Sequence, residues 1–285
     1  MVEFLSTSNG SQMTARHSPA RPLVDGYSDL ERVAVDYYAE HQLEPAHETE
    51  KLVRNLRVLL GPEIGNRRIA VIGCGPKPIM VRELIRRGAD AIGIEPVVGF
   101  TERAREYLDD PARVLLGSAE SLPVEDATLD VVVLETVLEH VESISKTLNE
   151  CFRTLKPSGV LYVVTTNRLA LGKNGEYRVR LFNWLPRLVQ EGYVFLQQHY
   201  RPELANYSSR PAVHWFTFAD LCAHGRQAGF SRFYSLIDLL DESSPAVQKS
   251  RLRRIALPLV KYNPWFRALA LTQYGAAIFM LKRRD

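Results

Sequence analysis

The sequence has few cysteines, little net charge and no long apolar run, and each of these features excludes a class of protein. Only 3 cysteines occur among 285 residues, and Cys74, Cys151 and Cys222 lie far apart, which argues against a disulfide framework. The formal net charge is +3, too small and too dispersed for the basic face that nucleic-acid binding requires. These features predict a cytoplasmic protein with no nucleic-acid partner.

No uninterrupted apolar run approaches the roughly 20 residues that span a bilayer. The nearest candidate, residues 254–281, is broken by polar and charged positions. We therefore reject a spanning helix, while peripheral contact with a membrane through the basic, apolar stretch from Arg251 to Arg267 stays open. Residues 1–22 lack the apolar core of a signal peptide, and we expect them to form a flexible tail.

From Arg68 to Asn167, short β-branched runs alternate with helical stretches and are joined by short turns. This alternation predicts a parallel sheet covered by helices on both faces. Residues 23–60 show helical spacing and are expected to be lead-in helices. The alternation of strands and helices stops over residues 168–213, a segment far longer than an ordinary connection. We therefore expect a substrate cap inserted here, within one domain of residues 23–285.

The run IAVIGCGPKP at residues 69–78 ends a predicted strand in two glycines and begins a helix. Gly73 and Gly75 allow the main chain to turn and to approach a ligand, and the helix N-terminus presents free N–H groups. Glu95 ends the next predicted strand, where a carboxylate accepts both hydroxyls of a ribose. The pair predicts a nucleotide-cofactor site. Pro78 stands where a nicotinamide dinucleotide favours a small residue and counts against that cofactor.

Four segments stand in register: IAVIGCGPKP, AIGIEP, LLGSAESLPVEDATLDVVVLETVLEHVES and FRTLKPSGVLYVVTTNR. In this order and spacing the chain resembles the class I S-adenosylmethionine-dependent methyltransferases, over residues 66–167 and again over 213–230. The resemblance implies S-adenosylmethionine as cofactor. It also implies an α/β fold with a doubly wound, mostly parallel seven-stranded sheet and an antiparallel last strand; the helical cap expected from residues 168–213 is inserted after the fifth strand.

The resemblance further implies where the cofactor lies. The glycine loop would border its methionyl part, Glu95 would hold the ribose, and the backbone at Ala119 and Glu120 would read the edge of the adenine. Ser118 stands where the family often has an acidic residue, so a side-chain bond to the adenine amine is weaker here. The predicted cofactor-binding residues are Gly73, Cys74, Gly75, Glu95, Pro96, Ser118, Ala119, Glu120 and Glu135.

The segment LETVLEHV, residues 134–141, supplies candidates for a catalytic base. It follows the fourth predicted strand, and residues at strand C-termini line the crevice of an open α/β sheet. His140 is suited to take a hydroxyl proton at neutral pH, and His214 is the second candidate. The alternative is that Glu139 and His140 merely cap the next helix.

Some relatives that act on catechol-like or ribose hydroxyls carry Glu-x-x-Glu-His here and add a later histidine, forming a divalent-metal site. This sequence has Thr136 where the first Glu belongs, and Glu135 is displaced by one position. We predict no metal, and a site of Glu135, Glu139, His140 and His214 stays as an alternative.

Aromatic side chains of residues 168–213 are expected to form the core of the cap and the walls of a substrate pocket. The sequence thus predicts an enzyme that transfers a methyl group to a hydroxyl of a small or medium acceptor, such as a natural product, a quinone-like compound, a sugar or a lipid-linked glycan. Carbon or nitrogen acceptors, a nicotinamide-dependent oxidoreductase and a non-catalytic cofactor-binding partner protein stay open. The sequence leaves the oligomeric state unknown.

Overall fold

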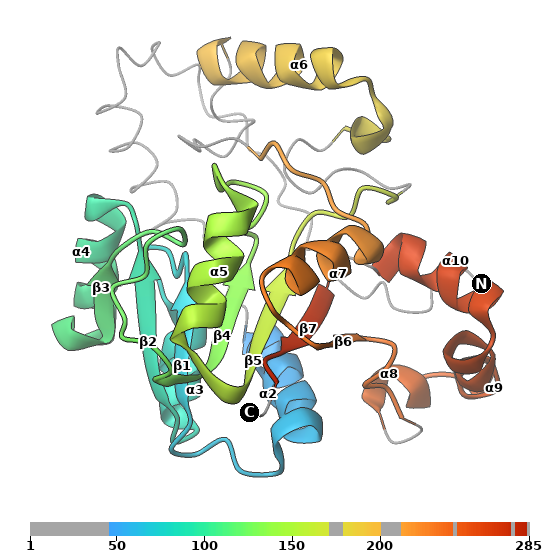
Figure 1. Ribbon diagram of the computed structural model, residues 1–285, viewed down its shortest axis with the longest axis horizontal. Helices are drawn as coiled ribbons and strands as arrows, with labels where there is room; N and C mark the ends of the chain where they lie inside the picture. Colours follow the sequence, from blue (N-terminus) through green and yellow to red (C-terminus); the bar gives the residue numbers. More distant parts are fainter. Residues whose placement is uncertain (1–45, 171–178, 201–211, 242–243, 275–276, 284–285) are drawn as a thin grey trace.

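The computed structural model describes residues 46–170, 179–200, 212–241, 244–274 and 277–283. In this part of the chain one seven-stranded sheet has the strand order β3-β2-β1-β4-β5-β7-β6, with helices on both of its faces (Figure 1). The strands are β1 (Arg68–Ile72), β2 (Asp90–Glu95), β3 (Val114–Leu116), β4 (Leu129–Glu135), β5 (Leu155–Val164), β6 (Arg232–Ser235) and β7 (Ala277–Leu281). The helices are α2 (Ala46–Leu60), α3 (Ile79–Arg86), α4 (Val98–Leu108), α5 (Ile144–Thr154), α6 (Arg187–Tyr200), α7 (Phe218–Gln227), α8 (Pro245–Gln248), α9 (Arg251–Tyr262) and α10 (Pro264–Tyr274), with short 3-10 turns η1 (Pro111–Arg113) and η2 (Phe182–Trp184).

Strand pairing confirms the predicted fold class. β1 pairs in parallel with β2 and β4, and the parallel pairs β2–β3 and β4–β5 extend the sheet on either side. β7, the last strand of the chain, runs antiparallel to both β5 and β6. The sheet is therefore doubly wound and mostly parallel, and the carboxyl ends of β1 to β5 meet at one edge.

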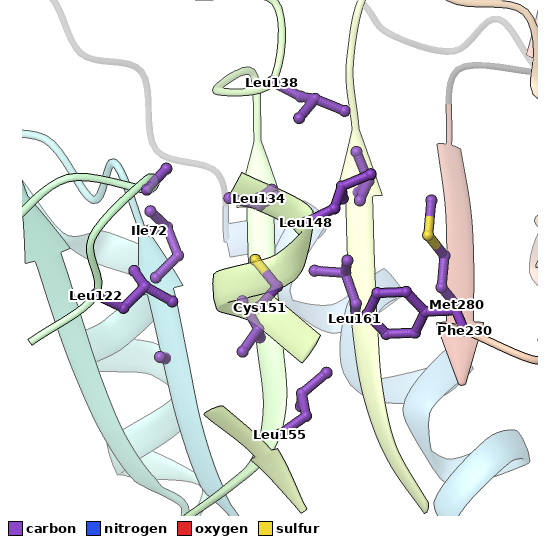
Figure 2. Packing of buried hydrophobic residues seen from close by; sticks show 14 of the residues in the cluster. Ile72, Leu122, Leu134, Leu138, Leu148, Cys151, Leu155, Leu161, Phe230 and Met280 are labelled. Carbon is purple, nitrogen blue, oxygen red and sulfur yellow. The ribbon is translucent and has the colours of Figure 1, made fainter. Parts of the chain in front are cut away.

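Two hydrophobic clusters fill the two faces of the sheet. On one face, α5 packs on β4 and β5 while α7 packs against α5 and β7, and Figure 2 shows Leu148 and Cys151 of α5 over Leu134 and Leu161. On the other face, α2, α3 and α4 pack on the same sheet. Strands that are buried on both faces have continuous apolar sequences, which is why β1 and β4 can be predicted from the sequence.

Lys156–Gly159, a Lys-Pro-Ser-Gly run of the kind that favours a turn, lies inside β5 instead. Leu155 already pairs with Leu129, and Val160 pairs with Val131, so the intervening residues form an irregular bulge within the strand. Ser158 has a positive φ of 64° there. A bulge absorbs the extra residues without ending the pairing, so the turn signal marks a bulge rather than a strand boundary.

The segments outside the central sheet are described in part. α2 lies within residues 23–60, where lead-in helices are expected, whereas residues 23–45 and the predicted tail, residues 1–22, lie outside the described residues. α6 follows β5 and lies beyond the edge of the sheet at which β4 and β5 end (Figure 1). Among the described helices none is long and apolar enough to cross a membrane.

Candidate active site

The loop after β1 touches the loop after β4. Gly73 and Gly75 have positive φ angles of 65° and 67°, a conformation that glycine adopts at least cost. The N–H of Gly73 donates to the carbonyl of Ile94 at 2.7 Å. A Cβ on Gly73 would lie 2.6 Å from Cγ2 of Val137, so no larger residue fits without displacement. The two glycines thus bring main chain against the loop after β4.

Cys74, between these glycines, is held by packing. Its side chain is buried against β2, where a Cβ on Gly93 would lie 2.6 Å from the Cys74 Sγ. Burial raises the pKa of the Cys74 thiol, and the nearby Glu95 carboxylate raises it further. A protonated, enclosed thiol is a poor nucleophile, so the contribution of Cys74 to this loop is its backbone and its packing.

Glu95 ends β2 beside the glycine loop. Its Oε2 accepts the N–H of Gly75 at 3.0 Å, and its Oε1 accepts the N–H of Val97 at 3.2 Å. The side chain is only 4% exposed, and burial raises its pKa to about 7 although the two N–H bonds act in the opposite direction. Each carboxylate oxygen has two acceptor positions, so this arrangement fits a diol that donates to the remaining ones. Pro96, exposed, follows directly.

The predicted adenine side lies after β3, next to Glu95 in the sheet, because Leu116 is in register with Glu95. Ser118 forms a bridge with Ser121, and Ala119 is buried in the core. Oε1 of Glu120 accepts the N–H groups of Glu142 and Ser143 at 2.8 and 2.9 Å. The Glu120 carboxylate thus ties this loop to the start of α5. This agrees with a role for its backbone rather than its side chain toward a ligand.

The loop after β4 begins in an unusual conformation. Thr136 has a positive φ of 54°, which is rare for a β-branched residue, and its hydroxyl donates to the carbonyl of Glu135 at 2.7 Å. The pKa of Glu135 is raised to about 7, first by burial and then by the Glu48 carboxylate of α2, while Lys51 lowers it. Residues with strained backbone concentrate at functional sites. The conformation of Thr136 therefore also indicates that the loop after β4 belongs to a functional site.

Glu139 has a structural role. Its fully buried carboxylate accepts the hydroxyls of Thr165 at 2.7 Å and Thr166 at 3.3 Å, at the end of β5. Its carbonyl accepts the N–H groups of Val213 and His214 at 2.9 and 3.3 Å. Glu139 therefore holds the chain returning from residues 168–211 against the ends of β4 and β5. Nowhere in the described ranges do three or more His, Cys, Asp or Glu side chains form a group suited to a metal ion.

Both predicted base candidates lie at this loop. His140 follows Glu139 directly, and the His214 backbone is bonded to Glu139. Nε2 of His214 is 3.0 Å from the carbonyl of Val141, and because a carbonyl only accepts, Nε2 carries the proton of this bond. Burial lowers the pKa of His214, against the opposing effect of the Val141 bond. A neutral ring with Nε2 protonated leaves Nδ1 as an acceptor, the state that a general base needs.

The region after β5 is anchored at Asn167. The Asn167 side chain donates to the Thr272 carbonyl at 3.0 Å and accepts the N–H of Leu169 at 3.0 Å, and its carbonyl accepts the Asn183 amide at 2.7 Å. Phe182, Val194 and Ala212 form a small separate core, with the Phe182 ring 5.8 Å from that of Trp215. Two of the aromatic residues expected in the cap, Tyr177 and Tyr207, lie outside the described residues.

Sequence reasoning missed three contributors to this site: Val137, the Thr165–Thr166 pair and Asn167. The polar run Thr-Thr-Asn directly after a buried strand was an available signal, because residues at strand C-termini line the crevice. Val137 carries no such signal, since only its position opposite Gly73 gives it a role.

Comparisons with known proteins show which proteins the chain is similar to. Residues 70–163 match a family model described as "Methyltransferase domain". The ubiquinone biosynthesis O-methyltransferase of Azorhizobium caulinodans is 36% identical over 142 residues, 47% of this chain and 53% of that protein. That of Bradyrhizobium diazoefficiens is 32% identical over 154 residues, 52% of this chain and 57% of that protein. The chain thus spans about half the length of these relatives.

A solved structure, the plantazolicin methyltransferase BamL in complex with a triazolic desmethylPZN analog and SAH, has a TM-score of 0.53 at 16% identity and covers 90% of this chain and 92% of that chain. At this identity the likeness concerns the fold alone. Sheet order, glycine loop and the acidic end of β2 define an α/β domain of the kind that binds a nucleotide cofactor. Over residues 70–163 the chain is therefore similar to a methyltransferase domain, which agrees with the resemblance to class I S-adenosylmethionine-dependent methyltransferases seen in the sequence.

Proposed function

We propose that the chain is an enzyme that binds S-adenosylmethionine at the ends of β1, β2 and β3 and transfers its methyl group to a hydroxyl of a small, quinone-like aromatic acceptor. The observation that carries this proposal is the meeting of three elements at one sheet edge. They are the loop of Gly73 and Gly75, the Glu95 carboxylate, and the loop after β4 with His140 and His214 beside it. A cofactor held by the first two would have the third within reach.

The residues present fit that cofactor. Glu95 has acceptor positions for a ribose diol, and Gly73 and Gly75 leave main chain rather than side chains facing a ligand. When bound, S-adenosylmethionine supplies a methyl group on a sulfonium, which is electrophilic without further activation. The protein therefore has to align a nucleophile, exclude water and accept a proton.

The acceptor class is supported by the relatives, whose names describe O-methylation in ubiquinone biosynthesis. A quinone carbonyl cannot take a methyl group with loss of a proton, so the acceptor form is a hydroquinone or a catechol. In the presence of S-adenosylmethionine, Nδ1 of His214 would accept the hydroxyl proton of the acceptor, because the Val141 carbonyl fixes the ring proton on Nε2. His140, on the same loop, is the second base in this proposal.

Residues 168–213 act in this proposal as the substrate cap. Their small core of Phe182, Val194 and Ala212 rests beside the end of β5, and Asn167 anchors it. Several apolar side chains of this segment remain exposed, including Trp184 and Phe195, and offer walls for an aromatic ring. Cap closure over the methyl group would exclude water from the reaction.

Histidine variants test the base. Replacing the base with alanine should lower turnover by about 10²–10⁴-fold with little change in S-adenosylhomocysteine affinity. We expect this loss in His214→Ala and a smaller one in His140→Ala. His224→Ala removes a neighbouring imidazole whose ring, like that of His214, lies against Phe216, and it should lower turnover far less than His214→Ala. If both single variants and the double variant keep normal turnover, the base assignment fails and a carbon or amine acceptor becomes the better reading.

Calorimetry separates the cofactor alternatives. S-adenosylhomocysteine should bind and NADH should not; the reverse result would support an oxidoreductase. Turnover should persist after chelator treatment, because the Glu139 carboxylate is occupied by Thr165 and Thr166. Loss of turnover that added Mg²⁺ restores would instead support the metal alternative.

A further inference from the structure

α9 and α10 present an apolar face to the outside. They lie between β6 and β7 in the chain and form the outer edge of the molecule on the β6 side (Figure 1). Along α9 the exposed apolar side chains recur at helical spacing: Leu252 is 76% exposed, Ile255 67%, Leu259 47% and Tyr262 83%. This spacing places them in one stripe. On α10 the stripe is followed by Trp265, 83% exposed, and Leu269, 60% exposed.

Among the described residues, the side of these helices that packs on the domain is the one opposite the apolar stripe. Leu257 of α9 is buried against Leu240 and Val247. On α10, Arg267 pairs with both carboxylate oxygens of Asp238 at 2.7 and 2.9 Å. Thr272 accepts the bond from Asn167 at the end of β5. A soluble helix normally turns its polar side outward, and α9 does the reverse over four positions.

The charge around the stripe has one sign. Residues 249–274 contain no Asp or Glu, and their basic residues are Lys249, Arg251, Arg253, Arg254, Lys261 and Arg267. On α9, Arg251, Arg254 and Lys261 each precede a residue of the stripe by one position, so they form a row along its flank. Apolar and aromatic side chains bordered by Lys and Arg are the pattern of helices that lie in the interface of an anionic membrane.

We propose that the α9–α10 face docks on the surface of an anionic lipid bilayer. Acyl chains cover Leu252, Ile255 and Leu259, while Tyr262 and Trp265 lie at the headgroup level, where amphipathic rings are favoured. The basic row pairs with lipid phosphates. A second copy of this chain fits less well, because a two-fold contact would set the basic row against itself with no acid in either face. A nucleic acid would leave the apolar stripe facing phosphates.

Vesicle sedimentation of the full chain tests this proposal. We expect binding to vesicles of phosphatidylcholine mixed with phosphatidylglycerol, weak binding to phosphatidylcholine alone, and release by salt. Arg251→Gln with Arg254→Gln should lower the partition coefficient roughly 30-fold, from about 1 kcal/mol for each basic residue near such a surface. Tyr262→Ser with Trp265→Ser should lower it at least tenfold, on the order of one buried aromatic side chain.

The controls replace side chains of the same kinds elsewhere. Val58→Ser on α2 and Arg86→Gln on α3, both exposed, should leave the partition coefficient unchanged. Circular dichroism melting verifies that every variant is folded. Three results would overturn the proposal. One is equal binding to both vesicle types, and another is loss of vesicle binding in Leu188→Ser of α6 while the α9–α10 variants bind normally. The last is a dimer that forms without vesicles and that Tyr262→Ser with Trp265→Ser dissociates. The first result rejects anionic lipid, the second the surface, and the third the occupant.

Discussion

The pKa of Glu95 leads to a pH dependence of cofactor binding. With a pKa of about 7 in the free protein, about a tenth of the Glu95 carboxylates are ionised at pH 6 and about nine tenths at pH 8. Ribose hydroxyls donate to the ionised form, so the cofactor lowers this pKa when it binds. The dissociation constant for S-adenosylhomocysteine should therefore fall roughly tenfold from pH 6 to pH 8, as the carboxylate ionises before binding.

The Glu95→Gln variant isolates this effect. Glutamine keeps the size of the side chain but removes the charge, and because its amide nitrogen only donates, one of the N–H groups of Gly75 and Val97 loses its acceptor. We expect affinity to fall by about 1.5–3 kcal/mol at pH 8, roughly 10- to 150-fold, and to be nearly independent of pH. Glu102→Gln on α4, an exposed carboxylate, is the control and should behave as the wild type.

Isothermal titration calorimetry across this pH range measures both quantities, and buffers of different ionisation enthalpy count the protons released. Wild-type affinity that stays constant between pH 6 and pH 8 would refute the link between the Glu95 charge and the cofactor. Wild-type affinity in Glu95→Gln would refute the ribose assignment itself.

Three further outcomes test the packing around the site. Gly93→Ala should lower the free energy of unfolding in urea by about 1–3 kcal/mol, because the new Cβ would lie 2.6 Å from the Cys74 Sγ. Adding Cys74→Ala should recover part of this loss. If Gly93→Ala costs the same in the wild type and in Cys74→Ala, that contact is contradicted. Asn167→Ala should speed hydrogen exchange in α6 and lower turnover more than cofactor affinity, whereas unchanged exchange would show that Asn167 does not anchor that region. The Glu95 pKa is raised from 4.5 to about 7, so its contribution to stability is complete below pH 4.5 and is lost as pH rises through 7. In melts without ligand, Glu95→Gln should therefore remove up to about 3 kcal/mol of this decline, and an unchanged pH profile would contradict it.

The sheet and the residues on the cofactor side of the site can be predicted from the sequence for a physical reason. β1 and β4 are buried on both faces and read as unbroken apolar runs, and the residue that follows each run falls at the sheet edge. Gly73, Glu95 and Glu135 become neighbours through strand register alone: Ile72 pairs with both Ile94 and Leu134. The place of these residues can therefore be predicted once the strands that precede them are identified in the sequence.

Other roles depend on contacts between distant segments. From the sequence, Glu139 could be a metal ligand, a helix cap or a buried anchor, and its bonds to Thr165 and Thr166, directly after the neighbouring strand β5, favour the anchor. The state of His214 follows from Val141, which is 73 positions away in the chain. The basic, apolar character of residues 251–267 is visible in the sequence, but which side of α9 faces outward follows from the burial of Leu257.

The central claim, methyl transfer to oxygen, is tested most directly by supplying S-adenosylmethionine with an isotopically labelled methyl group together with catechol and hydroquinone acceptors. Mass spectrometry and NMR of the products then show whether the label moves and to which atom. The account predicts a labelled O-methyl ether and one S-adenosylhomocysteine for each ether formed. No transfer to any of these acceptors, or a label found on carbon or nitrogen, would contradict it.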